Sequence, residues 1–380
     1  METRGLNADN HGMRGDEPRQ TTMYAAVSME QMVERQLAAD HPLREIKRFT
    51  DAVLRDLSPD FDSLYAAGGR PSVAPELLLR ALLWQALHSV RSERQLVVEI
   101  QFNLLARWFV GLPLDHAAWD ATTFSKNRKD QRLLVLSALF FERHLDFLRA
   151  ANLLSSDHLS VDGTLLQAWA SQKSLVPRAD LDDDGKPPAP PKGGRNEWVD
   201  FKGTTRSNKT HVSATDKDAR LASKGDTPRL SHELNVLAEN RNNFVVGFSV
   251  DEWSGTSERE AAAALVRAEA AKGRCPKTLG GDKKYSDGDA LVLELDAMGV
   301  HPHFSVRDDR PNALARIFHD EPGFPVSVRK RMRIDEQMSY VKTVANLRQV
   351  KVRLRARVAG VVAIALAAAN ITRRAGMVTC

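Results

Sequence analysis

Cysteine is scarce in this chain of 380 residues, where only Cys275 and Cys380 occur, far apart in the sequence. Two cysteines alone form no zinc site and no framework of disulfides, so the composition indicates a reducing compartment such as the cytoplasm. Hydrophobic residues make up 42% of the chain and charged residues 27%, which is typical of a soluble globular protein. The length is sufficient for two domains.

Long apolar runs are also missing. No stretch of 18 consecutive apolar residues occurs, and the closest one, residues 358–369, is too short to span a bilayer and predicts a buried helix. The first 20 residues contain no apolar core of a signal peptide, and we expect residues 1–28 to form a disordered extension. A glycine-rich phosphate loop of the P-loop type is absent as well.

Positive charge is present in moderate excess, with a net charge of +5 and a pI of about 9.2. Its distribution is more informative, because residues 329–357 contain ten Lys and Arg against two acidic residues. Such a basic helical stretch suits the phosphate backbone of DNA, although a solvated helix face is the alternative. The predicted DNA contacts are Lys283, Arg329, Lys330, Arg331, Arg333 and Lys342.

The chain divides into two parts by its patterning. Apolar residues at helical spacing predict that residues 29–150 are all-helical, a domain for DNA binding or assembly. Ser92 with Gln95 three residues later is a capping-box pattern, which predicts a helix start. Helix-turn-helix geometry around residues 76–101 and a plain helical bundle remain equal alternatives.

Residues 151–374 change to a pattern of strands and helices, with a flexible proline-rich insertion at about 177–200. The expected strands and extended segments are 158–167, 209–221, 229–238, 243–251, 277–281 and 300–306. The expected helices are 256–271, 287–298 and a long one from about 327. Antiparallel strands followed by strand–helix units indicate an α+β domain. The order of elements is the one used by ribonuclease-H-like folds.

Three carboxylates occupy informative positions in this order. Asp162 lies in the middle of the first strand, Asp282 directly follows a later strand, and Asp335 or Glu336 lies in the basic stretch. Carboxylates that converge from separate elements are what a pair of Mg²⁺ ions needs for phosphodiester chemistry. The alternative is that each aspartate caps a turn, as the dipeptide Asp162-Gly163 often does.

Two cations and two further residue pairs complete the candidates. Arg331 and Lys342 stand four residues before and seven residues after Asp335, which predicts one shared helix face. His301 and His303 would share one face of a strand, with no third ligand nearby. Trp169 and Trp253 are expected in the core rather than as platforms for bases.

At this point the chain resembles DDE-type insertion-sequence transposases of the IS-five family, from about residue 29 to residue 374. The N-terminal strings that carry the resemblance are DHPLREIKR (40–48), GRPSVAPELLLRALL (69–83), HSVRSERQLV (88–97), FNLLARWFVGLPLD (102–115) and TTFSKNR (122–128). The later strings are HLSVDGTLLQAWAS (158–171), RSNKTHVSATDKDARL (206–221), AENR (238–241), GTSEREAA (255–262), LGGDKKY (279–285), PGFPVSVRKRMRIDE (322–336) and KTVANLR (342–348).

The resemblance implies a helical N-terminal transposase domain and a ribonuclease-H-like catalytic domain whose acidic triad binds Mg²⁺ or Mn²⁺. Asp162 and Asp282 match the family's two aspartates, and Asp335 stands where the family has a glutamate. Arg331 and Lys342 match its arginine and its downstream lysine. One departure is that residues 338–340 read Met-Ser-Tyr where the family usually has Phe-Gly-Trp.

The leading hypothesis is therefore a bacterial, cytoplasmic and nucleoid-associated transposase. It would bind the terminal inverted repeats of an insertion sequence, cleave the DNA ends and join them to target DNA as a homodimer or larger assembly. The alternatives are a decayed or recruited transposase that only binds DNA, a hydrolytic nuclease of the same fold, and a helical interaction module without a nucleic-acid role.

Overall fold

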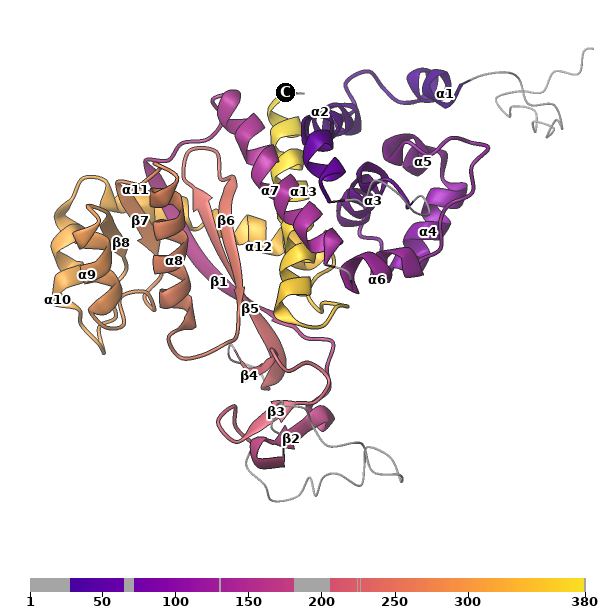
Figure 1. Ribbon diagram of the computed structural model, residues 1–380. Helices are drawn as coiled ribbons and strands as arrows, with labels where there is room; N and C mark the ends of the chain where they lie inside the picture. The colour runs from indigo at the N-terminus through magenta and orange to yellow at the C-terminus, as the bar shows by residue number, and fades with distance from the viewer. Residues whose placement is uncertain are drawn as a thin grey trace, which may run out of the picture.

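The computed structural model describes residues 28–64, 72–129, 131–180, 206–223, 225 and 227–378 (Figure 1). The expected disordered extension at residues 1–28 lies outside the described residues except for Ser28. Most of the expected insertion at residues 177–200 lies outside them as well.

The helical part occupies one side of the molecule (Figure 1). Its helices are α1 (Met29–Gln36), α2 (Pro42–Asp62), α3 (Pro75–Leu87), α4 (Glu93–Phe102), α5 (Leu104–Val110), α6 (Thr122–Lys129) and α7 (Arg132–Ala150). Pro42 and Pro75 begin α2 and α3, where the missing amide hydrogen costs nothing. The Ser92 hydroxyl accepts from the Gln95 amide at 3.2 Å and caps α4, which confirms the predicted helix start.

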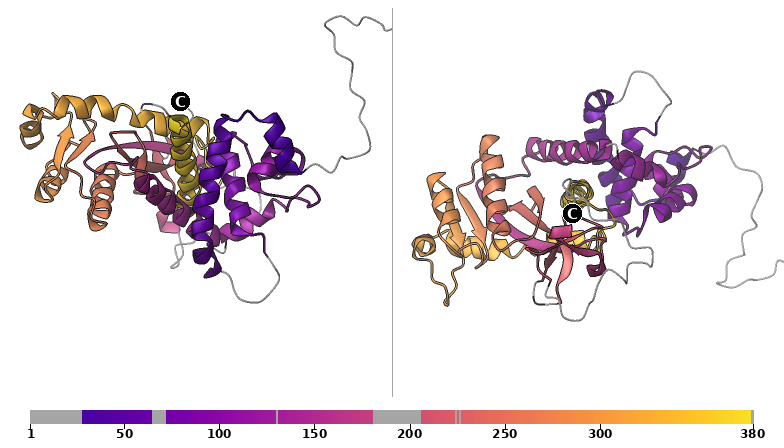
Figure 2. Two further views of the ribbon diagram at one scale, coloured as in Figure 1. Left: turned by 90° about the horizontal axis from the view of Figure 1, so that it is seen from above. Right: turned by 60° about the horizontal axis from the view of Figure 1, so that its bottom comes forward.

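The last helix, α13 (Arg355–Val378), packs between the helical part and the sheet (Figures 1 and 2). It contacts α2, α3 and α7 on one side and β6 on the other. Residues Val358 and Val362 to Ala369 are buried, so the prediction of a buried helix at 358–369 is confirmed. By length and composition α13 is the one described helix able to cross a membrane, but 61% of its apolar window is buried, as in the core helix of a soluble protein.

A mixed sheet forms the other part of the molecule. Its strands are β1 (His158–Gln167), β4 (Arg220–Ala222), β5 (Arg229–Glu239), β6 (Val245–Asp251), β7 (Thr278–Gly281) and β8 (His301–Phe304). The order is β4-β5-β1-β7-β8, and β6 pairs with β5 beside β4. β5 runs antiparallel to β1, β4 and β6, whereas β7 is parallel to both β1 and β8. The α+β class expected from the sequence is therefore confirmed.

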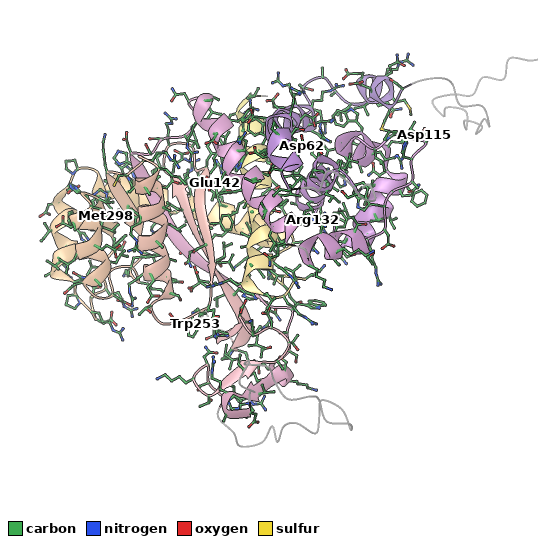
Figure 3. All side chains as sticks on the ribbon, viewed as in Figure 1. Asp62, Asp115, Arg132, Glu142, Trp253 and Met298 are labelled. Atoms are coloured by element: carbon green, nitrogen blue, oxygen red, sulfur yellow. The ribbon has the colours of Figure 1, made fainter. Side chains whose placement is uncertain are left out.

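Helices cover both faces of this sheet. Successive residues of a strand point to opposite faces, so one strand packs against both layers of helices. Val161 and Leu279 pack toward α8 (Ser257–Ala271) and α9 (Ala290–Ala297). Leu166 and Val236 belong to the core shared with α12 (Ile334–Thr343) and α13. Lys272 after α8 forms an ion pair of 2.9 Å with Glu142 of α7, labelled in Figure 3, which ties the sheet part to the helical part.

The basic stretch differs from its prediction. The long helix expected from about residue 327 is three helices, namely α11 (Phe324–Arg331), α12 and α13. Residues 344–354 between α12 and α13 are not helical, and Asn346 and Leu354 in this segment have φ values of 57° and 72°. Left-handed backbone of this kind ends a helix. The prediction of one long helix over this basic stretch was therefore wrong.

Smaller differences concern the segment expected to be extended at residues 209–221 and the tryptophans. The segment forms two short strands, β3 (His211–Ser213), which pairs with β2 (Leu175–Pro177), and β4, with a loop between them. In this loop Asp218 accepts from the Arg355 amide at 2.8 Å and so caps α13. Trp169 is 45% exposed, so its expected burial in the core was wrong.

Candidate acidic active site

Asp162 and Asp282 are neighbours because their strands are. In the parallel pair β1–β7, Ser160 lies opposite Gly280, and each aspartate follows two residues later. Asp282 comes directly after the carboxyl end of β7, as the sequence predicted. The two carboxylates therefore lie beside each other at the edge where β7 ends, with Asp162 in the middle of the longer strand β1.

α12 brings the third carboxylate to this edge. Asp335 lies in the first turn of α12 and is exposed, and Lys342 follows two turns later on the same helix. Arg348 comes from the non-helical segment after α12. The end of β1 holds this segment, because the Gln167 amide donates to the Arg348 carbonyl at 3.0 Å and the Val350 amide donates to the Gln167 carbonyl at 2.9 Å.

These side chains surround one cavity of about 480 Å³, which we call the acidic cavity. Its lining consists of Asp162, Gly163, Thr164, Asp282, Lys284, Asp335, Met338, Ser339, Lys342, Thr343 and Arg348. Carboxylates and cations are present in equal number. The carboxylates suit hard divalent cations and the Lys and Arg side chains suit phosphate oxygens, so both halves of a metal-bound phosphodiester have matching groups here.

Local contacts hold the two strand-derived aspartates in place. Asp282 Oδ1 accepts from the Lys284 amide at 2.9 Å, which fixes the turn after β7. Asp162 Oδ1 accepts from the Gly163 amide at 2.7 Å. A Cβ at position 163 would lie 2.7 Å from Asn235 Oδ1 of β5 and 3.0 Å from Glu258 Oε1 of α8. Both side chains crowd this position, and Gly163 lies within β1 rather than in the turn that the dipeptide Asp162-Gly163 offered as an alternative.

Tyr285 lies in the turn after β7, three residues after Asp282. Its ring is fully buried against Phe304, with ring centroids 5.8 Å apart. Burial raises the pKa of the Tyr285 phenol well above its usual value, and the charges of Asp162, Glu258 and Asp282 raise it further. The phenol therefore stays neutral and is an O–H group among carboxylates.

Several predicted site residues lie elsewhere. Glu336 does not line the acidic cavity, because it faces α13 and pairs with Arg373 at 2.5 Å. Arg331 ends α11, whereas Asp335 belongs to α12, so the predicted shared helix face was wrong for Arg331. It is right for Lys342, which lies on α12 and lines the same cavity as Asp335. Arg329, Lys330, Arg333 and Lys283 do not line the cavity either. The geometry therefore distinguishes the two residues that the sequence left open, because Asp335 lines the cavity and Glu336 does not.

The DNA contacts predicted from the sequence left out two cavity cations, and one nearby acid was not predicted. Lys284 and Arg348 line the cavity. Lys284 Nζ also lies 3.6 Å from Glu258 Oε2. Lys284 stands two residues after Asp282, and this spacing was a usable signal. No signal in the sequence pointed to Arg348, because its position depends on the pairing of residues 348–350 with the end of β1.

The histidine pair has the third partner that the sequence did not show. His301 Nδ1 and His303 Nε2 both contact the carboxylate of Glu321, at 2.7 and 3.0 Å. His303 Nδ1 also lies 2.7 Å from the Ser327 hydroxyl of α11. Burial lowers the pKa of His303, although Glu321 opposes this effect. These contacts form a polar link between β8 and α11.

Across the part of the chain that the structure describes, no three His, Cys, Asp or Glu side chains form a group that could hold a metal ion. The donor chemistry of the acidic cavity still fits magnesium or manganese, because its carboxylates are Asp162, Asp282 and Asp335 and its cations suit a phosphate counterpart. The three aspartates line one cavity but are not drawn together on a single point.

Fold and site together define an α+β protein with an acidic cavity at one sheet edge and a helical N-terminal part. Within that class, residues 31–130 match the model of the family described as Transposase domain (DUF772). The match covers about a quarter of the chain and lies within the helical part. A comparison with curated proteins found no match.

Solved structures of the Mos1 transposase show a weak similarity. The paired-end complex with left transposon end has 12% identity and a TM-score of 0.20, with 77% of this chain and 84% of that chain covered. The strand transfer complex has 12% identity and a TM-score of 0.21 over the same shares. The mariner paired end complex with Mn has 13% identity and a TM-score of 0.21, over 83% and 91% of the two chains. At such TM-scores the similarity carries no weight for this chain.

Proposed function

We propose that this protein is a transposase that cleaves and joins DNA at the ends of an insertion sequence, of the DDE type and the IS-five family. The observation that carries the proposal is the meeting of Asp162, Asp282 and Asp335 in one cavity with Lys284, Lys342 and Arg348. The match of residues 31–130 to a transposase domain supports the same function independently of the cavity.

Each cavity residue has a role in this proposal. Asp162, Asp282 and Asp335 would hold Mg²⁺ or Mn²⁺, and two such ions would activate the attacking oxygen and stabilise the leaving oxygen of a phosphodiester. Lys284, Lys342 and Arg348 would contact phosphate oxygens and orient the scissile bond. Glu336 keeps a structural role through Arg373.

The domain division is part of the proposal. Residues 29–150 would bind terminal inverted repeats, and residues 151–374 would form a ribonuclease-H-like catalytic domain. Apart from the short strands β2, β3 and β4, the chain order β1, β5, β6, α8, β7, α9, β8 matches the order of elements predicted from the sequence for this fold, which supports the proposal. Since two DNA ends have to be joined, the active form would be at least a homodimer, and it would act in the bacterial cytoplasm at the nucleoid.

The test is DNA nicking by the purified protein with 5 mM MgCl₂. The substrate is a supercoiled plasmid that carries the genomic segment encoding this chain with its flanks. We expect nicked or linear product from the wild type and a loss of roughly 10²–10³-fold for Asp162→Asn and for Asp282→Asn, because each substitution weakens the binding of the metal ions that would stabilise the transition state. EDTA should abolish the reaction.

The matched control is Asp309→Asn, an exposed carboxylate outside the cavity. If Asp162→Asn and Asp282→Asn both nick the plasmid as fast as the wild type, the assignment of the site is overturned. DNA binding without any nicking would instead support a DNA-binding protein without catalysis. Cutting without joining of pre-nicked ends would support a nuclease.

A further inference from the structure

A second cavity lies where the helical part meets the segment between α12 and α13, and its rim is basic. The cavity measures about 390 Å³, and α3, α4, α6, α7 and α13 contribute to its walls. Its charged lining residues are Arg91, Glu93, Arg94, Arg128, Lys351 and Arg357. We call these six residues the basic seam.

Positive charge in the basic seam is largely uncompensated. The only acid of the seam, Glu93, is already paired with Arg128, which is 8% exposed. Arg91, Arg94 and Lys351 are exposed at the rim. Burial lowers the pKa of Arg128 to about 10, and the charge of Arg357 lowers it further.

The floor of this cavity is aliphatic. Leu82, Val90, Leu133, Leu347 and Ile364 are among its lining residues. Charges above an apolar floor interact more strongly with an anion than charges in bulk water do, because the local dielectric is lower. The rim therefore suits a polyanion better than its number of charges alone indicates.

The basic seam and the acidic cavity share one chain segment. Arg348 lines the acidic cavity, whereas Gln349 and Lys351, one and three residues later, line the second cavity. Two contacts join this segment to the turn between α3 and α4. The Ser89 hydroxyl donates to the Val344 carbonyl at 2.7 Å, and the Lys351 ammonium donates to the Arg91 carbonyl. Figure 1 shows α6 beside the first turns of α13, into which this segment leads.

We propose that the basic seam binds the phosphate backbone of the same DNA duplex whose scissile bond occupies the acidic cavity. This inference rests on the proposed function and specifies which surface carries the DNA. The inference divides the basic stretch of residues 329–357 into two groups. Arg348, Lys351 and Arg357 lie on the path of the duplex. Arg329, Lys330 and Arg331 on α11 line neither cavity. The same inference also explains how the helical part and the sheet part act on one DNA molecule.

The experiment measures salt dependence of DNA binding by fluorescence anisotropy. The probe is a labelled duplex of 30 base pairs, and the full chain is compared with the double variant Arg91→Gln/Arg94→Gln. Both side chains are exposed, so the fold should tolerate the change. The slope of log K against log salt should become less negative by roughly one to two, because each lost phosphate contact contributes about 0.9.

The matched control is Arg35→Gln/Arg55→Gln, which removes the same charge from exposed positions of α1 and α2. Its slope should equal that of the wild type. An unchanged slope for the seam variant, or an equal change in the control, would overturn the seam while wild-type binding still supports the proposed function. Absence of DNA binding by the wild type would overturn both. Binding that persists in Asp162→Asn would separate the seam from catalysis.

Discussion

Asp335 and Glu336 illustrate what a single residue position decides. Adjacent residues on a helix point about 100° apart, so only one of the two carboxylates faces the sheet edge. The sequence left both open because either residue could open the helix with the same charge. The contact of Glu336 with Arg373 of α13 distinguishes them, and this contact joins residues 37 positions apart.

The difference leads to a paired prediction. Asp335→Ala should lower DNA nicking by roughly 10²–10³-fold, because the cavity loses one of the three carboxylates proposed to hold the metal ions. Glu336→Ala should leave nicking nearly unchanged and should destabilise the fold, because Arg373 loses its partner. Nicking rates and urea midpoints of both variants check this. The reverse order of the two nicking rates would move the third ligand to Glu336.

Gly281 is a second position where one atom matters. A Cβ there would lie 2.8 Å from Cδ1 of Phe304 and 2.9 Å from Cδ2 of Tyr285, and both rings are fully buried. We expect Gly281→Ala to destabilise the protein by about 1–3 kcal/mol, because neither ring has room to move. Urea unfolding measures the change.

The matched control is Gly255→Ala, since a Cβ at that position meets nothing within 4 Å. It should leave the urea midpoint unchanged or slightly raised. Equal midpoints for the two alanine variants would mean that the rings under Asp282 adapt easily.

At the scale of elements, local patterning predicted the strands better than the last helices. The strand-like residues of β1 and the apolar run before Asp282 mark those elements directly in the sequence. The break between α11 and α12 falls at Met332 and Arg333, where neither proline nor glycine occurs. It depends on packing of α11 against β7 and β8 and of α12 against β1, which no local pattern contains.

One polar contact joins three of these elements in the core. The Asn370 side chain of α13 donates to His144 Nε2 of α7 at 3.0 Å, and its Oδ1 accepts from the Val245 amide of β6 at 2.9 Å. Burial lowers the pKa of His144 from 6.5 to about 4. The imidazole is therefore neutral in the folded protein at neutral pH.

The lowered pKa predicts a loss of stability in acid. Between pH 6.5 and 4 the unfolded chain binds a proton at His144 that the folded chain does not, so the free energy of unfolding falls as pH falls through this window. The loss should approach about 3 kcal/mol for this group. Urea unfolding at pH 7.5, 5.5 and 4.5 measures it.

The matched pair for this measurement is His144→Gln and His116→Gln, since His116 is exposed. The first variant should be less stable at pH 7.5 but lose less stability in acid, and the second should follow the wild type. An unchanged pH dependence in His144→Gln would mean that other groups cause the acid loss.

At the scale of the whole molecule, α13 makes the two parts one folding unit. Its residues join a single hydrophobic core that includes Leu54 and Leu83 of the helical part and Val236 of the sheet. The sequence indicated a buried helix here but not what covers it, because its apolar residues occur on all sides and point to no partner.

A core substitution in α13 should therefore weaken both parts together. Leu366 is fully buried, and Leu366→Ala should lower the free energy of unfolding by about 2–5 kcal/mol through the cavity it leaves. Hydrogen exchange should show the same loss of protection in α3 and in β5, because both pack in the core that α13 completes. Val378→Ala on the exposed end of α13 is the control and should change protection in neither element. Loss of protection in α3 with β5 unchanged would show two units that unfold separately, and DNA held by the basic seam would then have to bridge parts that move independently.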